Sequence, residues 1–511
     1  MVHLQLRELL QMMHTCRTLY DLGIPLILRD ITYLSGSSAL DKLYVHLLSD
    51  PRRFGHIRSI TCSHGKQVLP VHNVDTTLVD FSLELIRLGS NIRRLDLCFL
   101  IPSQFTQHDI TQIASLTCLR VLALRGRPPI AQLLKALTVP LKAVTIEAMY
   151  FGIYDGTDNA AIGLGDLMPA LEKFGTSLES LTVQLQNLPD TPYIFSARCN
   201  FPAMKEVHWR APHPLNVGEL AKVFPNVIGL VVRSYFTDEV KFPSHALPPM
   251  SPVQIDDLRH QNRNATQWDE KHFLRYLSGD TMSLLTLGVR CYVENLEVDF
   301  LRHPRRIISL CCLLADVQPS CLKVKMLCAN SMNSASPETF VCRSVRVLEL
   351  ELGTTASTVM NALTWMVCVA VLFVINHTYA PLKVAFLRCD DWKQLRSAND
   401  CHIQYLCIKF ATLLYPGLPE AEWRQQFDFF NWDRAAALFF KAIPSLKQVT
   451  IDVPKRTWRH TDLILQDPSL SRELFLTRKD EPKPSVQRAV NPPFATRLVN
   501  NFRRMWPRGS M

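Results

Sequence analysis

A short pattern of apolar residues recurs along this 511-residue chain and constrains its fold more than any other feature. The pattern has apolar residues at positions 1, 4 and 6 and ends on a polar residue at position 7, the exit position; Leu119 to Arg125 is its clearest copy. Side chains alternate between the two faces of a strand, so positions 4 and 6 share one face and the exit residue projects from the other. A strand this short cannot bury its apolar face alone, and the copies are therefore expected to stack.

We assign eleven candidate segments to the pattern, and they are spread over most of the chain. They begin at Ile57, Ile92, Leu119, Leu141, Leu178, Met204, Val227, Leu284, Val345, Leu382 and Leu446. Four intervals between successive copies are 22–27 residues long, within the range of roughly 20–29 residues for leucine-rich repeats. Helical apolar spacing lies between copies at residues 109–116, 165–175 and 217–224. This alternation predicts parallel strands with helices on one face of the sheet.

The pattern and the composition divide the chain into five segments. These are a helical cap at 1–50, a regular leucine-rich-repeat-like array at 51–240, a proline-rich insertion loop at 241–268, an irregular array at 269–455 and a basic, proline-rich, flexible tail at 456–511. Within the irregular array, Leu322–Leu327 is a degraded copy, because Lys325 stands where an apolar residue is expected.

The net charge of +10 comes mainly from the tail. Residues 454–511 hold twelve Lys and Arg against five Asp and Glu, which is +7, so the other residues carry only +3. Such a balance argues against a body that binds nucleic acid, and only the Arg and aromatic residues of the tail could touch it weakly. We expect a protein target as the partner.

Cysteine usage and the apolar segments bear on the compartment. Fifteen cysteines are scattered through apolar stretches, and Arg7 and Glu8 interrupt the apolar N-terminus, so no signal peptide is recognised. Reduced, buried thiols in a cytoplasmic or nuclear protein are expected.

Residues 359–375 are 17 uncharged residues, at the lower edge of transmembrane length. Because the strand pattern resumes at Leu382, a buried helix is favoured over a membrane span.

The cap carries the residues of a family resemblance. Apolar spacing predicts one helix over residues 3–22, ended by Gly23 and Pro25, then an extended run over 24–31 and a second helix over 40–48. The Cys16-Arg17 pair with Leu19 and Tyr20, followed by the stretch from Gly23 to Arg29, resembles the C-terminal half of a fungal F-box domain. That family's opening helix is not recognised ahead of these residues. The alternative is a plain cap that covers the apolar edge of the first repeat.

The whole chain resembles fungal F-box-like leucine-rich-repeat proteins. The resemblance implies an α/β leucine-rich-repeat-like solenoid, or horseshoe, with parallel strands on the concave face, helices outside and a short helical cap. It also implies a substrate receptor, whose cap binds the Skp-type adaptor of a cullin ubiquitin ligase and whose concave face binds a protein target. The candidate adaptor-facing residues are Leu9, Leu10, Met13, Cys16, Arg17 and Tyr20. A repeat scaffold without a ligase link is the alternative.

No catalytic, metal-binding or cofactor-binding motif is recognised, so an enzyme is not expected. The exit positions offer the one candidate site, because arginine fills five of the eleven. Arginine is common at protein interfaces and binds acidic groups. The candidate partner-binding residues are Arg125, Arg210, Arg233, Arg290, Arg388 and, projecting from the same face, Phe386. The alternative is that exposed strand ends simply tolerate arginine.

Overall fold

The computed structural model shows two compact units. Unit 1 comprises Met1–Pro212, Lys222–Asn226 and Pro484–Met511, and unit 2 comprises His213–Ala221 and Val227–Lys483. The structure describes residues 6–34, 39–63, 83–99, 106–126, 130–148, 164–185, 199–211, 215–234, 251–265, 272–300, 306–327, 344–354, 402–412, 436, 439–440, 443, 445–453, 456–461 and 477–478.

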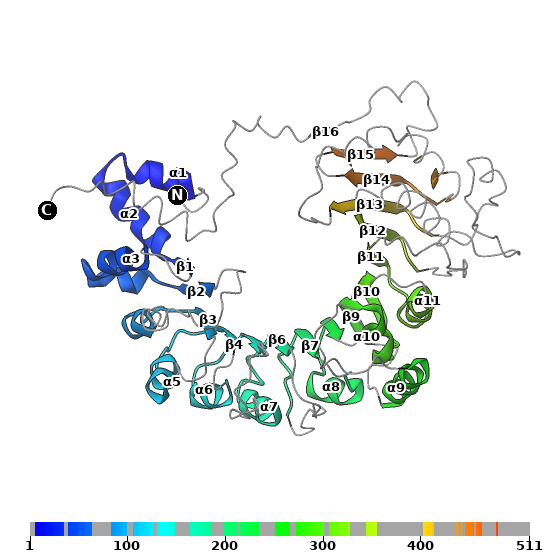
Figure 1. The fold of residues 1–511 in the computed structure, drawn as a ribbon, viewed down its shortest axis with the longest axis horizontal. Coiled ribbons are helices and arrows are strands. Elements are labelled where there is room, and N and C mark those ends of the chain that lie inside the picture. The colour runs from blue at the N-terminus through cyan, green and yellow to red at the C-terminus, as the bar shows by residue number, and fades with distance from the viewer. Residues whose placement is uncertain are drawn as a thin grey trace, which may run out of the picture. The chain divides into compact units, whose positions relative to one another are not determined.

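Unit 1 is an α/β structure in which each strand pairs in parallel with the next strand along the chain (Figure 1). Its strands are β1 (Asp30–Leu34), β2 (Ser59–Ser63), β3 (Arg94–Phe99), β4 (Val121–Gly126), β5 (Ala143–Ala148), β6 (Ser180–Leu185) and β7 (Glu206–Ala211). Its helices are α1 (Leu6–Met13), α2 (Arg17–Leu28), α3 (Ala39–Leu48), η1 (Pro51–His56), α5 (Gln107–Ala114), α6 (Ile130–Ala136) and α7 (Leu164–Glu172). Helix α8 (Val217–Val223) has residues in both units.

The register of unit 1 aligns the apolar positions of the pattern. The position-4 residues of neighbouring strands are directly paired and are at most 1% exposed; from β2 to β7 they are Ile60, Leu95, Leu122, Val144, Leu181 and Val207. Helices α5, α6 and α7 cover the face of the sheet that carries this core (Figure 1). The predicted α/β architecture with parallel strands is therefore confirmed.

The cap differs from the prediction. The single helix expected over 3–22 is two helices, and Gly23 and Pro25, which were expected to end it, lie inside α2. Cys16 separates the two helices with an extended backbone, φ −160° and ψ 160°. Where α1 packs on α2, a Cβ atom on Gly23 would lie 2.3 Å from Met13 Sδ, so a larger residue would require the Met13 side chain to move. The extended run expected over 24–31 is correspondingly wrong up to Leu28, whereas α3 agrees with the helix expected over 40–48.

Unit 2 is also an α/β structure with strands in chain order (Figure 1). Strands β8 to β14 are parallel, β15 pairs with β14 in antiparallel fashion, and β16 pairs with β15 in the same way. The strands are β8 (Gly229–Ser234), β9 (Phe273–Asp280), β10 (Tyr292–Phe300), β11 (Cys321–Leu327), β12 (Val347–Thr354), β13 (Tyr405–Thr412), β14 (Gln448–Val453), β15 (Arg456–Thr461) and β16 (Thr477–Arg478). The helices are α9 (Pro252–Ala265), α10 (Thr281–Leu287) and α11 (Arg306–Val317).

One predicted copy of the pattern is wrong. The segment from Leu284 to Arg290 was expected to be a strand, but its first part belongs to helix α10. Asp280 caps this helix by accepting a hydrogen bond from the Ser283 amide at 2.9 Å, and Gly288 ends it with a left-handed φ of 61°. Arg290 consequently lies in the turn before β10 and is not an exit residue.

The insertion loop predicted over 241–268 is wrong for residues 252–265, which form α9. Ser251 and Gln254 exchange hydrogen bonds in a capping box, and Pro252 occupies the first turn, where a missing amide donor costs nothing. Asn262, 2% exposed, then ties α9 to its neighbours by donating to the carbonyls of Leu215 at 3.0 Å and Thr286 at 2.7 Å.

Two further expectations concern the C-terminal part of the chain. The flexible tail expected from residue 456 is wrong at its start, because Arg456–Thr461 pairs with β14 as strand β15. The apolar segment 359–375, the copy beginning at Leu382, Phe386 and Arg388 lie outside the described residues. Among the residues that are described, no helix is long and apolar enough to cross a membrane.

Candidate protein-interaction face

The candidate site is the face of the sheets opposite the buried apolar rows. We call it the strand face and define it by the side chains at positions 5 and 7, because both alternate with buried positions 4 and 6. In unit 2 the register aligns Val231 and Arg233 of β8, Ser278 and Asp280 of β9, Glu297 and Asp299 of β10, Lys323 and Lys325 of β11, Glu349 and Glu351 of β12, Cys407 and Lys409 of β13, and Thr450 and Asp452 of β14.

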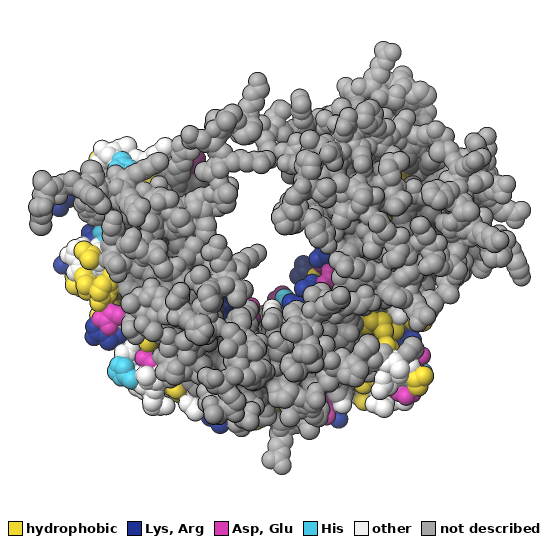
Figure 2. Space-filling model, viewed as in Figure 1, with side chains coloured by type: hydrophobic (Ala, Val, Ile, Leu, Met, Phe, Trp, Pro, Cys, Tyr) yellow, Lys and Arg dark blue, Asp and Glu magenta, His cyan; other side chains and the backbone are white. Residues whose placement is uncertain are grey.

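The charges of this face change sign from one strand to the next. Two carboxylates on β10 are followed by two lysines on β11, two carboxylates on β12, one lysine on β13 and one carboxylate on β14. We call the charged residues of β10 to β13 the charge ladder: Glu297, Asp299, Lys323, Lys325, Glu349, Glu351 and Lys409. Basic and acidic side chains are both visible near β10 and β11 in Figure 2.

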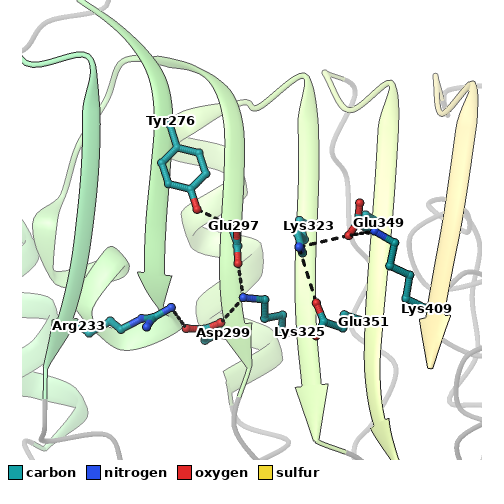
Figure 3. Close-up of polar contacts among 9 residues, drawn as sticks. All are labelled: Arg233, Tyr276, Glu297, Asp299, Lys323, Lys325, Glu349, Glu351 and Lys409. Atoms are coloured by element: carbon teal, nitrogen blue, oxygen red, sulfur yellow. Dashed lines mark hydrogen bonds and ion pairs between the residues drawn. The ribbon is translucent and has the colours of Figure 1, made fainter. Parts of the chain in front are cut away.

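Ion pairs connect the charge ladder across its strands (Figure 3). Lys325 Nζ pairs with the Glu297 carboxylate and lies 3.6 Å from Asp299 Oδ1. Lys323 Nζ lies 3.3 Å from Glu349 Oε1, and Lys409 Nζ donates a hydrogen bond to that same oxygen at 2.9 Å. Each lysine therefore neutralises carboxylates on neighbouring strands.

Two residues extend this network toward β8 and β9 (Figure 3). The Tyr276 hydroxyl of β9 donates a hydrogen bond to Glu297 Oε2 at 2.8 Å. Arg233 of β8 reaches past β9 to Asp299, with Nη2 2.7 Å from Oδ2. The exit residue of β9, Asp280, is 4% exposed and caps α10.

The pairs hold these groups in their charged forms. Burial alone would raise the pKa of Glu297, but the hydrogen bonds from Lys325 and Tyr276 outweigh it and keep the pKa below the ordinary 4.5. Burial alone would lower the pKa of Lys325, but Glu297 and Asp299 outweigh it and raise the pKa above 10.5. The lowered Glu297 pKa adds stability above about pH 4.5 and the raised Lys325 pKa adds stability below about pH 10.5, so this ion pair is intact throughout the neutral range.

Reversing the charge at the centre of the charge ladder is expected to destabilise unit 2. Lys325→Glu replaces two attractive cross-strand contacts by repulsive ones, and we expect a loss of about 1–3 kcal/mol in the free energy of unfolding. Lys325→Met, which only removes the attraction, should lose less. Adding Glu297→Lys to Lys325→Glu exchanges the charges of one pair and should recover part of the loss. Urea denaturation of the variants measures this, and equal midpoints for Lys325→Glu and the unchanged chain would contradict it.

The strand face of unit 1 carries a smaller charged group. Arg125 of β4 lies 3.2 Å from Asp96 of β3 and 3.6 Å from Glu147 of β5. Asp96 is 2% exposed, and burial raises the pKa of its carboxyl although Arg125 and Arg94 act in the opposite direction. Among the described residues no donor reaches Asp96 Oδ1. The arginine expected to await a partner is thus already paired within the face.

The other predicted binding residues divide between those on the face and those off it. Arg210 is the exit residue of β7, as expected, and is partly exposed. Arg233 is also an exit residue and is paired with Asp299. Arg290 does not reach the face, and Phe386 and Arg388 lie outside the described residues.

The sequence reasoning missed most of the charge ladder. The copy on β11 has Lys325 at its exit position and Pro319, which is buried, at position 1, so the frame assumed from Leu322 was three residues late. Position 5 was considered only for Phe386, although strand alternation places every position-5 side chain on the same face as position 7. The alternation of Glu297, Asp299, Lys323 and Lys325 becomes visible in the sequence once this frame is used.

Within the described parts of the chain, no group of three or more His, Cys, Asp or Glu side chains is arranged to hold a metal ion. No protein-family model matches this sequence, and its comparison with curated proteins finds no match.

Proposed function

We propose that this chain is a protein-binding repeat protein that binds its target on the strand face. The observation that carries the proposal is the charge ladder, whose side chains keep 16–41% of their surface exposed although they are paired. A face built only for stability gains little from partly exposed ion pairs. Charged groups held in fixed geometry give a protein interface its specificity and register.

The strand–helix order of both units supports a leucine-rich-repeat-like solenoid with its strands on the concave side. In such a fold the strand face is the surface on which several repeats act together, because each repeat adds one strand to it. The mixture of lysines and carboxylates favours a protein target over a nucleic acid, whose phosphates demand a uniformly basic surface.

Site-specific photocrosslinking in the full chain tests this proposal. A photoreactive residue is placed at Thr182 or Thr450, which are partly exposed on the strand face, or at Thr111 or Asp257, which are exposed on helices α5 and α9. In the cells that produce the protein, we expect one shared adduct from the face positions and none from the helix positions. Adducts that form equally from both sets, or only from the helices, would show that the strand face is not the binding surface.

A narrower proposal is that the chain is the substrate receptor of a Skp-cullin-F-box type ubiquitin ligase. The resemblance of residues 16–29 to an F-box domain supports it, as does the exposure of Cys16 and Arg17 at the start of α2. Leu9, Leu10 and Met13 are 3–8% exposed, so these three candidate adaptor-facing residues pack inside the cap. Tyr20 is partly exposed.

Co-purification with a Skp-type adaptor tests the ligase link. Arg17→Glu should abolish retention of the adaptor, whereas Arg52→Glu, the reversal of an exposed arginine on η1, should leave it unchanged. Replacing Leu9 or Leu10 is less informative, because loss of a buried leucine unfolds the cap as well. If the unchanged chain retains no adaptor, the ligase proposal is wrong and the alternative of a repeat scaffold stands.

A further inference from the structure

We infer that the charge ladder of unit 2 binds a partner α-helix whose charges alternate in sign along its length and which lies across the strands. This inference rests on the proposed function and specifies the partner class. The ladder offers acidic, basic, acidic and basic strands in succession from β10 to β13. A complementary partner must therefore present basic, acidic, basic and acidic groups in the same order.

The charges of the ladder alternate in sign across the strands and not along them, and this determines how the partner helix must be oriented. Along any one strand the charges occupy only positions 5 and 7, which are about 7 Å apart and have the same sign. Across the strands, by contrast, the signs alternate over four neighbouring strands at intervals of about 4.8 Å. A partner that recognises the alternating signs must consequently lie across the strands.

The spacing selects a helix. On one face of a helix, side chains recur alternately three and four residues apart, which is about 5.3 Å on average at a rise of about 1.5 Å per residue. Over the three steps from β10 to β13, the helical spacing exceeds the strand spacing by about 1.5 Å in total. The long side chains of lysine and glutamate can bend enough to bridge this difference. An extended segment repeats its face about every 6.7 Å, so by the third step it has drifted by more than one strand and meets the wrong sign.

The paired carboxylates and ammonium groups can still form further hydrogen bonds with a partner. A carboxylate has about four lone-pair sites and an ammonium group three donors. Glu351 is joined to Lys323 at 3.7 Å, beyond hydrogen-bond distance, and 31% of its side chain is exposed. Lys409 donates a hydrogen bond to Glu349, and 41% of its side chain is exposed. Partner charges can therefore add to the network without breaking it.

A partner of uniform charge does not fit this face. A polybasic segment would be attracted by Glu297 and Glu349 but repelled by Lys323 and Lys409, whose ammonium groups lie between and beside them. A polyanion meets the opposite conflict. The same cancellation weakens the field at distance, so binding should depend only weakly on salt concentration.

Designed helical peptides of about 18 residues, added to the full chain, test the inference. The first carries Lys at positions i, i+7 and i+14 and Glu at i+3 and i+10. The second has the same composition with its lysines grouped at one end, and the third carries lysines alone. By fluorescence anisotropy the alternating peptide should bind at least about tenfold more tightly than the grouped one. Equal affinities for these two peptides would overturn the inference.

A change of specificity provides the second arm. Lys323→Glu with Lys325→Glu makes β10 to β12 uniformly acidic, so the variant should lose the alternating peptide and gain the all-lysine peptide. Lys323→Gln with Lys325→Gln, a milder change for folding, should lose the alternating peptide without that gain. Asp256→Lys with Asp257→Lys, a double reversal on exposed residues of α9, should change neither affinity.

The experiments can refute the alternating-helix inference and the proposed function independently of one another. If peptides bind the lysine variants and the unchanged chain alike while Thr450 still forms an adduct with a cellular protein, the alternating-helix inference is wrong and the proposed function stands. If the peptides discriminate but no adduct forms from the strand face, the proposed function is wrong.

Discussion

Asp316→Ala is expected to lower the free energy of unfolding of unit 2 by about 3–5 kcal/mol, because it leaves two largely desolvated arginines without their shared carboxylate. Arg259 and Arg263 of α9 both pair with Asp316 of α11, and the three side chains are only 12–13% exposed. Arg259 Nη2 lies 2.6 Å from Asp316 Oδ2 and also donates to the Cys312 carbonyl at 3.3 Å. The cluster thus joins two helices that are distant in sequence.

Urea denaturation, with hydrogen exchange followed in α9 and α11, measures this effect. Asp316→Asn keeps the shape but loses the charge, and should cost nearly as much. Asp257→Ala is the matched control, because it removes an exposed carboxylate from α9, the helix that carries the two arginines. This variant should change stability little. Replacing all three residues of the cluster by methionine should recover most of the stability, since a buried charge network can be exchanged for apolar packing. A loss below about 1 kcal/mol for Asp316→Ala would show that water still reaches the arginines.

The sequence predicts most of the strands for which a copy of the apolar pattern was identified. Two further segments that fit the pattern, Val293–Asp299 and Ile403–Lys409, were not identified and form β10 and β13. The copy from Leu119 to Arg125 alternates at positions 4, 5 and 6 and forms β4. The copy from Leu284 fails because its leucines at positions 1 and 4 are also one helical turn apart, so the spacing fits both structures. Its outcome depends on Asp280 and Gly288, which cap a helix there. The helix-capping residues, which the apolar pattern does not include, therefore determine that this segment is a helix and not a strand.

Two strands with an unusual residue at an apolar position were not predicted as full copies: β9 was missed, and β11 was expected only as a degraded copy. In β9 position 6 is Gly279, and in β11 position 1 is Pro319, so neither segment matches the pattern. Both are strands nonetheless, because pairing with their neighbours supplies the hydrogen bonds and the remaining apolar side chains are buried. Such tertiary support cannot be deduced from a single segment.

The candidate site was predictable only in part, for a related reason. The exit arginines are visible in the sequence, but their partners depend on register between distant segments. Arg233 pairs with Asp299, and Lys409 pairs with Glu349, which is 60 residues away in the chain. Only the strand pairing brings these residues to the same face, and it converts an apparent row of free arginines into an alternating set of charges.

Gly279→Ala is expected to destabilise unit 2 by at least about 3 kcal/mol, since the added methyl group has no room in the native backbone. Gly279 of β9 is paired with Val232 of β8, and a Cβ atom on it would lie 1.9 Å from the Val232 carbonyl oxygen. The obstacle is backbone, so a change of rotamer cannot relieve it. Leu284 Cδ2 would lie 3.3 Å from the same Cβ atom, which is also a tight contact.

The strands must therefore separate, and the effect should appear first where β8 and β9 pair. Hydrogen exchange of residues 273–280 should be accelerated in Gly279→Ala relative to the unchanged chain. Gly55→Ala is the matched control, because the nearest atom to its added Cβ, Asn91 Nδ2, is 3.9 Å away. The variant should also weaken binding of the alternating peptide, because β9 carries Tyr276 and separates Arg233 from its partner Asp299. If Gly279→Ala were as stable as Gly55→Ala, the close pairing of β8 with β9 could not be what supports this end of the charge ladder.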